Sequence, residues 1–293
     1  MFAYIPHELS FIQTLLSYRV EALNPLFIFL NHFDSGPFYC LVGIFCFSCL
    51  TPKQGIRLFA VLSLVIFSNY FLKNFFEQPR PLILDPSLGL VQSNSQFGLP
   101  SGAAQAATVM AMSFMQYFKS HWVKVLGIAY IILICISRVY IGMHFISDVL
   151  VGCLIGFIMM KLFMRYGEYC FAKCTQFGLW PIYGLAGVSI AITFGIKIPP
   201  SYQMGIGVFL GCLAAEVILK QTPFLDMRLS IGLKLGHFLI SLGVFSLLLY
   251  LHSQFGNVLV LKMFLLLNLL TLTTVMINKL SKRGQKETVR MPS

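Results

Sequence analysis

The segment SRVYIGMHFISD, residues 137–148, joins two strongly apolar stretches and contains an arginine, a histidine and an aspartate. Two further polar segments precede it, KNFFEQPRP at residues 73–81 and PSGA at residues 100–103. These three polar segments hold most of the side chains that can take part in chemistry. Cations, a serine, a histidine and an aspartate at the ends of apolar helices are best explained by the binding of a phosphate group.

The composition around these segments is that of a membrane protein. Of the 293 residues, 57% are hydrophobic and 11% are charged, with a mean hydropathy of +0.81, whereas about 25% of the residues of soluble domains are charged. Apolar runs long enough to cross a bilayer recur along the chain, which predicts an all-α, polytopic transmembrane helical bundle. Basic loops on one membrane face explain the net charge of +11, so we expect no nucleic-acid partner.

The order of apolar and polar stretches predicts how the chain is organised. The first 20 residues do not resemble a cleavable signal, and residues 6–19 predict an amphipathic helix in the membrane interface, followed by a short apolar piece at 23–33. Nine spans are then predicted, at about 37–50, 56–72, 101–118, 123–141, 145–164, 178–196, 203–219, 231–251 and 257–278. Most connectors are short, but residues 73–100 form a long one, and long connections in compact proteins tend to be functional.

Basic residues indicate the orientation. With nine spans, five basic segments fall on one side of the membrane, which the positive-inside rule makes cytoplasmic: residues 53–57, 119–124, 161–173, 220–234 and the tail from residue 279. The three polar segments then face away from the cytoplasm. Their cations lie on the side that the rule disfavours, which calls for a functional reason.

The cations of the first segment suit phosphate oxygens. Arg80 offers a planar fork and Lys73 a point charge. The alternative is that they snorkel from a helix end, which fits Lys73 better than Arg80, because Arg80 lies between two prolines. In the second segment, Ser101 and Gly102 precede an apolar run, so a helix N-terminus there would bind an anion; taken alone, an ordinary helix cap explains them better.

The third segment places a histidine four residues before an aspartate. If His144 and Asp148 share a helical face, the carboxylate can accept a hydrogen bond from one imidazole nitrogen and leave the other as nucleophile or base. The alternative is a His–Asp pair that only joins helices. Ionisable groups inside membranes are costly, which favours function.

Taken together, the three segments resemble the signatures of the type 2 phosphatidic acid phosphatase (PAP2) superfamily, Lys-x6-Arg-Pro, Pro-Ser-Gly-His and Ser-Arg-x5-His-x3-Asp. The resemblance covers about residues 38–165 and departs at Ala103, where the family has histidine. It implies a PAP2/haloperoxidase-like helical core that hydrolyses a lipid phosphate or pyrophosphate. His144 would form a phosphohistidine with Asp148 orienting it, while Lys73, Arg80, Ser101, Gly102 and Arg138 would hold the phosphoryl group. No metal or other cofactor is expected.

Ala103 leaves the activity open, because the missing histidine would protonate the leaving oxygen. Three explanations are open: the change is inactivating, the substrate is a pyrophosphate, or another acid serves, with His32, Asp34, Glu77 and Asp85 as candidates. A catalytically inactive phospholipid-binding protein and a lipid phosphotransferase therefore remain alternatives to the phosphatase.

These observations divide the chain into an interfacial region (residues 1–35), a PAP2-like core (36–177), additional transmembrane helices (178–278) and a basic cytoplasmic tail (279–293). In the additional helices, Gly207 and Gly211 suit close helix packing, including a homodimer, and Glu216 is predicted to pair with Lys220. The tail would lie against an anionic leaflet. A bacterial inner membrane, with the active site on the periplasmic side, is the expected setting.

Overall fold

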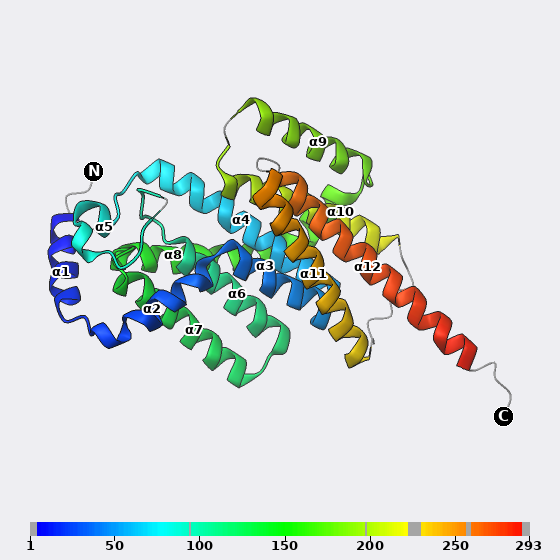
Figure 1. Ribbon diagram of the computed structural model, residues 1–293, viewed down its shortest axis with the longest axis horizontal. Coiled ribbons are helices and arrows are strands. Elements are labelled where there is room, and N and C mark those ends of the chain that lie inside the picture. The colour runs from blue at the N-terminus through cyan, green and yellow to red at the C-terminus, as the bar shows by residue number, and fades with distance from the viewer. Residues whose placement is uncertain (1–4, 94, 197, 222–229, 256–258, 289–293) are drawn as a thin grey trace. The chain divides into compact units, whose positions relative to one another are not determined.

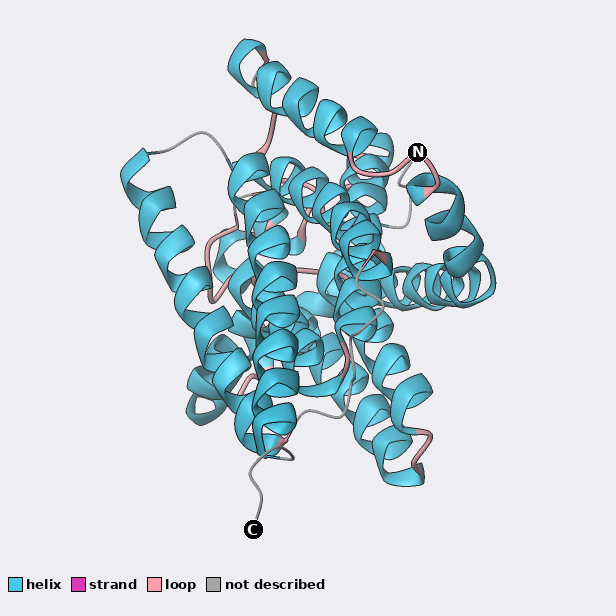
Figure 2. Ribbon diagram, turned by 90° about the vertical axis from the view of Figure 1, so that its right-hand side faces the viewer, coloured by secondary structure: helices cyan, strands magenta, loops and turns pink. Residues whose placement is uncertain are grey.

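A computed structural model describes residues 5–93, 95–196, 198–221, 230–255 and 259–288, and these residues are mostly helical (Figure 1). Within these ranges no strand is present, and the one isolated β-bridge pairs Pro79 with Phe97. Figure 2 accordingly shows only helices and loops. The prediction of an all-α fold is confirmed.

The helices follow the predicted order. The main helices are α1 (Ile5–Ser17), α2 (Asn24–Asn31), α3 (Gly36–Phe45), α4 (Pro52–Phe76), α5 (Pro81–Leu84), α6 (Gly102–Phe118), α7 (His121–Tyr140), α8 (Ile146–Thr175), α9 (Trp180–Gly195), α10 (Pro200–Lys220), α11 (Ile231–Phe255) and α12 (Leu259–Thr288). Short turns add η1 (Glu21–Leu23), η2 (His32–Asp34), the π-helical η3 (Cys46–Leu50) and η4 (Pro86–Leu88). Every predicted span has a helical counterpart. Helix α12 continues into the predicted tail, of which residues 289–293 lie outside the described ranges.

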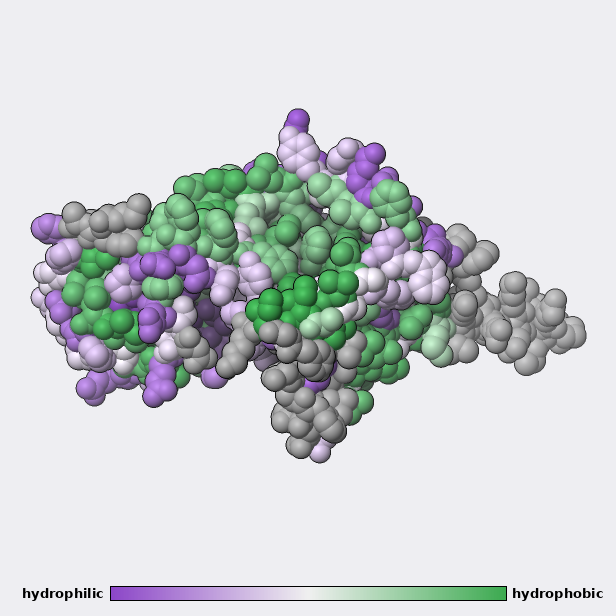
Figure 3. Space-filling view, turned by 90° about the horizontal axis from the view of Figure 1, so that it is seen from above, coloured by the Kyte–Doolittle hydropathy of each residue, from purple (hydrophilic) through white to green (hydrophobic). Residues whose placement is uncertain are grey.

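Length and composition support fewer membrane spans than the sequence predicts. Among the described residues, four helices are long and apolar enough to cross a bilayer: Pro52–Phe76, His121–Tyr140, Ile146–Thr175 and Tyr202–Lys220. The pair Glu21–Asp34 and Gly36–Leu50, bent by 65°, brings the number to five. Large apolar side chains cover much of the face seen in Figure 3. The chain is therefore an integral membrane protein, and the predicted count of nine spans stays a prediction.

The helices divide into two units, residues 1–39 with 65–165, and residues 40–64 with 166–293. All three polar segments belong to the first unit. Here α6 packs against α7, and α8 approaches α6 so closely that a Cβ on Gly152 would lie 2.5 Å from the carbonyl oxygen of Ser101. A glycine at position 152 thus lets the beginning of α8 meet the beginning of α6.

Helix α1 is attached to the first unit along one side. Ile12 and Leu16 are buried in a cluster with Leu88, Phe145 and Val149. Leu15 of α1 and Tyr18, which follows the helix, are exposed, as expected for a helix lying in an interface.

The second unit contains the C-terminal helices. Helix α10 packs on α9 and α12, and a Cβ on Gly211 would meet Leu267 of α12 at 3.0 Å, so this glycine permits close packing of the two helices. The predicted pair of Glu216 and Lys220 is long, at 3.8 Å between Oε1 and Nζ, whereas Arg57 Nη1 lies 2.9 Å from Glu216 Oε2. Glu216 therefore pairs mainly with Arg57, a contact between distant parts of the chain that sequence spacing does not reveal.

Candidate functional site

The long connector after α4 folds back on itself and brings the first polar segment to the third. The Gly98 amide donates to the Gln78 carbonyl at 2.7 Å, and the Arg80 amide donates to the Gln96 carbonyl at 3.1 Å. This pairing places Arg80 beside the turn before α8, where its Nη1 lies 3.2 Å from His144 Nε2.

His144 and Asp148 lie in contact, although not on one helical face. Helix α8 begins at Ile146, so His144 belongs to the turn before the helix and Asp148 to its first turn. The His144 Nδ1 atom is 3.2 Å from Asp148 Oδ2. Arginine can only donate, so Nε2 must accept from Arg80, and the neutral ring carries its proton on Nδ1. The geometry thus leaves the lone pair of Nε2 on the side of the cations.

Three donors hold the Asp148 carboxylate. Besides His144, the Phe145 amide donates to Oδ2 at 3.0 Å and the Gln78 side-chain amide donates to Oδ1 at 2.9 Å. Asp148 and Gln78 are both 0% exposed. A buried carboxylate with several donors has little freedom to turn, so the orientation of the imidazole is fixed through it.

The surroundings of His144 favour its neutral form. Burial lowers its pKa well below the usual value, and the positive charges of Arg80, Lys73 and Arg138 lower this pKa further. For Arg80, burial lowers the pKa to about 10, against the opposing effect of Asp34 and Asp148, so the guanidinium stays charged at neutral pH. A neutral imidazole beside charged guanidinium groups combines a nucleophile with anion-binding groups.

Arg138 lies at the end of α7 and is only 1% exposed. Its Nη1 donates to Asn31 Oδ1 at 2.7 Å and lies 3.5 Å from Asp34 Oδ2, while its Nε donates to Ser137 Oγ at 3.2 Å. Its Nη2 atom is buried without a hydrogen-bond partner among the described residues. A buried donor without an acceptor is costly, and an anionic oxygen would satisfy it.

Lys73 completes the group of cations. It lies in the last turn of α4, half-buried, and interacts electrostatically with Arg80 and Asp148. His144 experiences the charge of each of the three cations, and their role in holding one phosphoryl group stays a prediction.

The second polar segment forms the beginning of α6. Ser101 is the N-cap, and its Oγ accepts from the Ala104 amide at 3.4 Å, so the helix-cap interpretation of this serine holds. Its own amide donates to the Asp148 carbonyl at 2.9 Å. A Cβ on Gly102 would lie 3.0 Å from Asn69 Oδ1, which explains the need for a small residue. The amides of Gly102 and Ala103 precede the first hydrogen bonds of α6 and so suit an anion at this helix N-terminus.

Ala103 lies in an apolar cluster. It is 2% exposed and is buried with Ala107 and Ile134, with Phe33 and Tyr130 packed against them. Of the four candidate acids, Asp34 is the one that contacts a cation of the site. Asp85 is instead bonded to Gln13 and Ser87, whereas His32 and Glu77 are exposed.

Sequence reasoning did not assign a role to Gln78, Gly98, Asn31 or Asn69. Gln78 was within the first polar segment, but nothing in its spacing indicated that it reaches Asp148. Gly98 lies against the same carboxylate, since a Cβ there would be 2.6 Å from Asp148 Oδ2. Asn31 bonds Arg138, and Asn69 donates to the Pro100 carbonyl at 3.0 Å, so both support the site from other helices.

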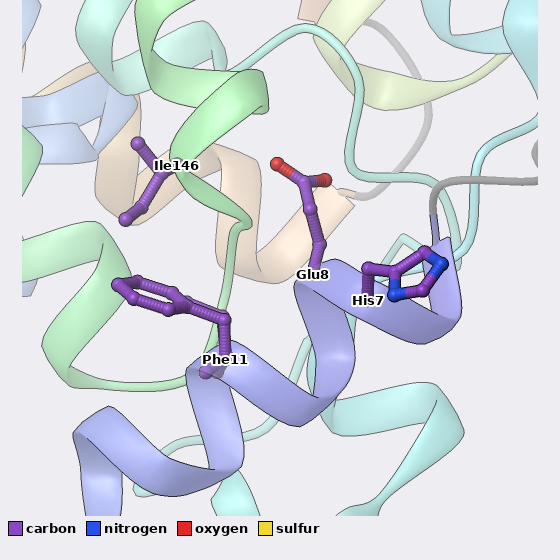
Figure 4. Close-up of a pocket in the computed structure, with 5 residues that line it drawn as sticks. His7, Glu8, Phe11 and Ile146 are labelled. Carbon is purple, nitrogen blue, oxygen red and sulfur yellow. The ribbon is translucent and has the colours of Figure 1, made fainter.

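A separate cavity of about 220 Å³ lies between α1 and the beginning of α8, lined by His7, Glu8, Phe11, Ile12 and Ile146. Figure 4 shows His7, Glu8 and Phe11 on α1 and Ile146 at the beginning of α8. The Glu8 carboxylate accepts from the Ser147 amide at 3.3 Å and from its hydroxyl at 2.8 Å. Helix α1 thus holds the residue next to Asp148.

Comparison with known proteins places the three polar segments within one matched region. Residues 54–172 match the model of the PAP2 superfamily. The chain is 30% identical over 145 residues to sphingosine-1-phosphate phosphatase 1 of Rattus norvegicus, an alignment that covers 47% of this chain and 34% of that protein. The chain thus spans about a third of the length of the sphingosine-1-phosphate phosphatases that it matches.

Shorter relatives are matched over more of their length. The chain is 29% identical over 142 residues to undecaprenyl-diphosphatase of Sulfolobus acidocaldarius, covering 47% of this chain and 68% of that protein. Among solved structures, the chain is similar to a transmembrane PAP2-type phosphatidylglycerolphosphate phosphatase from Bacillus subtilis, with a TM-score of 0.48 and 24% identity over 58% of this chain and 88% of that chain.

Proposed function

We propose that this chain is a PAP2-type membrane lipid phosphatase that removes a terminal phosphoryl group through a phosphohistidine at His144. The match to the PAP2 superfamily over residues 54–172 supports the family, because it contains all the proposed site residues from Lys73 to Asp148. The relatives named above are phosphatases, which supports the reaction class. The geometry of the site supports the assignment of roles.

The observation that carries the proposal is the hydrogen bonding of His144. The His144 Nδ1 atom donates to Asp148 Oδ2 at 3.2 Å, and Arg80 Nη1 lies 3.2 Å from His144 Nε2. When a phosphate group binds, Arg80 can move its Nη1 hydrogen bond from Nε2 to a phosphoryl oxygen, which frees the lone pair for attack. Binding of the phosphate to Arg80 thus also makes the Nε2 lone pair of His144 available for attack.

The reaction then proceeds in two steps. The Nε2 lone pair bonds to phosphorus while the bond from phosphorus to the lipid oxygen breaks. The imidazole gains positive charge, which Asp148 stabilises through the Nδ1 proton. Water then attacks phosphorus, the nitrogen–phosphorus bond breaks, and phosphate and neutral His144 are released. Throughout, Lys73, Arg80, Arg138 and the amides at Gly102 stabilise the phosphoryl oxygens.

We propose a lipid phosphate or lipid pyrophosphate as substrate, bound on the non-cytoplasmic side of a bacterial inner membrane. Apolar helices around the site and the names of the relatives support the lipid class, and the distribution of basic residues supports the side. The position of Ala103 favours one second candidate, a protein that binds phospholipid without turning it over, because a methyl group cannot protonate an alkoxide.

Phosphate release tests the proposal. We would incubate the purified full chain in detergent with phosphatidate, phosphatidylglycerophosphate, sphingosine-1-phosphate and undecaprenyl diphosphate. We expect release from at least one of them, and loss of release in His144→Ala. Equal release by His144→Ala would refute the phosphohistidine, whereas saturable binding of these lipids without release would support the binding protein.

A further inference from the structure

We propose that Asp34 protonates the leaving oxygen of the substrate, so that a carboxylic acid from the N-terminal segment performs the task for which position 103 has no proton donor. The inference rests on the proposed phosphatase function and adds a catalytic residue to it. Three observations carry it, namely the position of Asp34, the charges around it and the surroundings of the other carboxylates.

Asp34 contacts a cation of the site and belongs to the η2 turn, which packs against α6. Its neighbour Phe33 packs against the cluster that contains Ala103, which brings the η2 turn to the beginning of α6. The Asp34 Oδ2 atom is 3.5 Å from Arg138 Nη1, and Oδ1 accepts a hydrogen bond of 2.6 Å from the Tyr39 hydroxyl. The η2 turn thus places a carboxylate near the beginning of α6, where residue 103 has only a methyl side chain.

The charges around Asp34 are those that would surround the phosphoryl group. Besides contacting Arg138, its carboxylate interacts electrostatically with Lys73 and with Arg80. These are the same three cations that act on His144. Asp34 is therefore in the field of the whole cation cluster, whereas Asp148 is turned to the opposite nitrogen, Nδ1, of the imidazole.

Other carboxylates near the site are used differently. Glu8 is bonded to Ser147, and Asp85 is bonded to Gln13 and Ser87. Asp34 is 31% exposed in its side chain, so it keeps a path to a ligand while it contacts the fully buried Arg138. Asp34 is therefore both accessible to a ligand and in contact with a cation of the proposed phosphate site.

A proton for Asp34 arrives with the substrate. A phosphate monoester has a second pKa of about 6, so a fraction of it carries a proton near neutral pH. Asp34 takes that proton and passes it to the lipid oxygen as the phosphorus–oxygen bond breaks, so that lipid alcohol leaves and Asp34 is again a carboxylate.

The second step uses the same group in reverse. The Asp34 carboxylate accepts a proton from the attacking water as the new bond to phosphorus forms and the bond to His144 Nε2 breaks. The proton then leaves with the phosphate product. Overall, monoester and water give alcohol and phosphate, and both residues return to their starting states.

The test compares two lipids that share their acyl chains and differ in the leaving group. Phosphatidate loses diacylglycerol alkoxide, which needs a proton, while diacylglycerol pyrophosphate loses phosphatidate, which does not. The rate compared is that of leaving-group release in a single turnover, which reports the first step alone, because the second step is the same for both lipids. For Asp34→Asn we expect the rate of diacylglycerol release from phosphatidate to fall by about 10²–10⁴-fold, the usual contribution of a positioned acid. We expect the rate of phosphatidate release from the pyrophosphate to fall by less than about tenfold, because this leaving group needs no proton from an acid.

Two controls make the outcome decisive. Glu21→Gln removes an exposed carboxylate from the same N-terminal segment and should leave both rates unchanged. The KM of Asp34→Asn for phosphatidate should not rise, because the substitution removes a negative charge beside the phosphate. An equal loss of both rates would make Asp34 a binding or structural residue, and an unchanged phosphatidate rate would also overturn the inference. If the unsubstituted protein releases no phosphate from any lipid, the proposed function itself fails.

Discussion

Gly98 offers a test of how strictly the carboxylate of Asp148 must be placed. A Cβ at position 98 would lie 2.6 Å from Asp148 Oδ2, the oxygen that accepts from His144. Ordinary van der Waals contact begins at 3.4 Å, so in Gly98→Ala one of the two groups must move by about 0.8 Å. The backbone at Gly98 is held by its 2.7 Å hydrogen bond to Gln78, whereas the carboxylate is the end of a side chain. We therefore expect the carboxylate to be displaced, at the expense of the hydrogen bonds from its three donors.

A shift of that size takes the hydrogen bond from His144 beyond a useful length, since the two atoms are already 3.2 Å apart. A hydrogen bond to a charged group contributes about 1.5–3 kcal/mol, and each 1.36 kcal/mol in the barrier changes the rate about tenfold. We therefore expect kcat to fall by about tenfold to a hundredfold, in line with the effect of misplacing a catalytic group by about 1 Å.

The assay is phosphate release in detergent at equal protein concentration, with the melting temperature measured on the same samples. Gly184→Ala is the matched control, because a Cβ on Gly184 in α9 meets nothing within 4 Å. We expect Gly98→Ala to melt a few degrees below the unsubstituted protein, because the lost hydrogen bond also stabilises the fold, but to be folded at the assay temperature while losing turnover. Activity within twofold of the unsubstituted protein would refute the claim that Asp148 sets the orientation of His144.

Three further predictions follow from the same contacts. Gln78→Met removes a donor to Asp148 while keeping the length of the side chain, and kcat for phosphate release should fall about tenfold; an unchanged kcat would contradict this. The lowered pKa of His144 means that the unfolded chain binds more protons than the folded chain below about pH 6.5, so stability is lost as the pH falls. The melting temperature of His144→Asn should therefore fall less between pH 7 and 5 than that of the unsubstituted protein, and parallel curves would argue against a neutral His144. Glu8→Ala removes the acceptor for Ser147 at the beginning of α8 and should destabilise the fold by about 1 kcal/mol, seen as a melting temperature a few degrees lower; equal melting temperatures would show that this cap is unimportant.

Local chemistry explains what could be predicted from the sequence. Proline, serine and glycine before an apolar run indicated where α6 begins, and the four-residue spacing brought His144 to Asp148. Both patterns predict structure correctly because each depends only on residues within about one turn of one another. The alternative acids were also open to sequence reasoning, since Asp34 ends the first apolar region.

The remainder depended on contacts between distant residues. No pattern in the sequence pairs Gln78 with Gly98 or directs Asn31 to Arg138, because a long connector has many possible return paths. The number of spans was also beyond prediction from hydropathy. Helix α6, with 17 residues, is apolar because much of it is buried in protein. Burial in protein and exposure to lipid both favour apolar side chains, so hydropathy alone does not distinguish a buried helix from a membrane span.

Helix α1 and the segment that follows it are bonded at several separate points to the loops near the site. Glu8 bonds Ser147, Gln13 donates to Asp85 at 2.8 Å, and Arg19 donates to the carbonyls of Leu88 and Tyr140 at 2.7 Å each. Because α1 is predicted to lie in the membrane interface, we expect these bonds to pass lateral pressure from the bilayer to the loops around His144. We therefore expect turnover to depend on acyl-chain length and curvature of the host membrane, even for a short-chain substrate that diffuses freely in water.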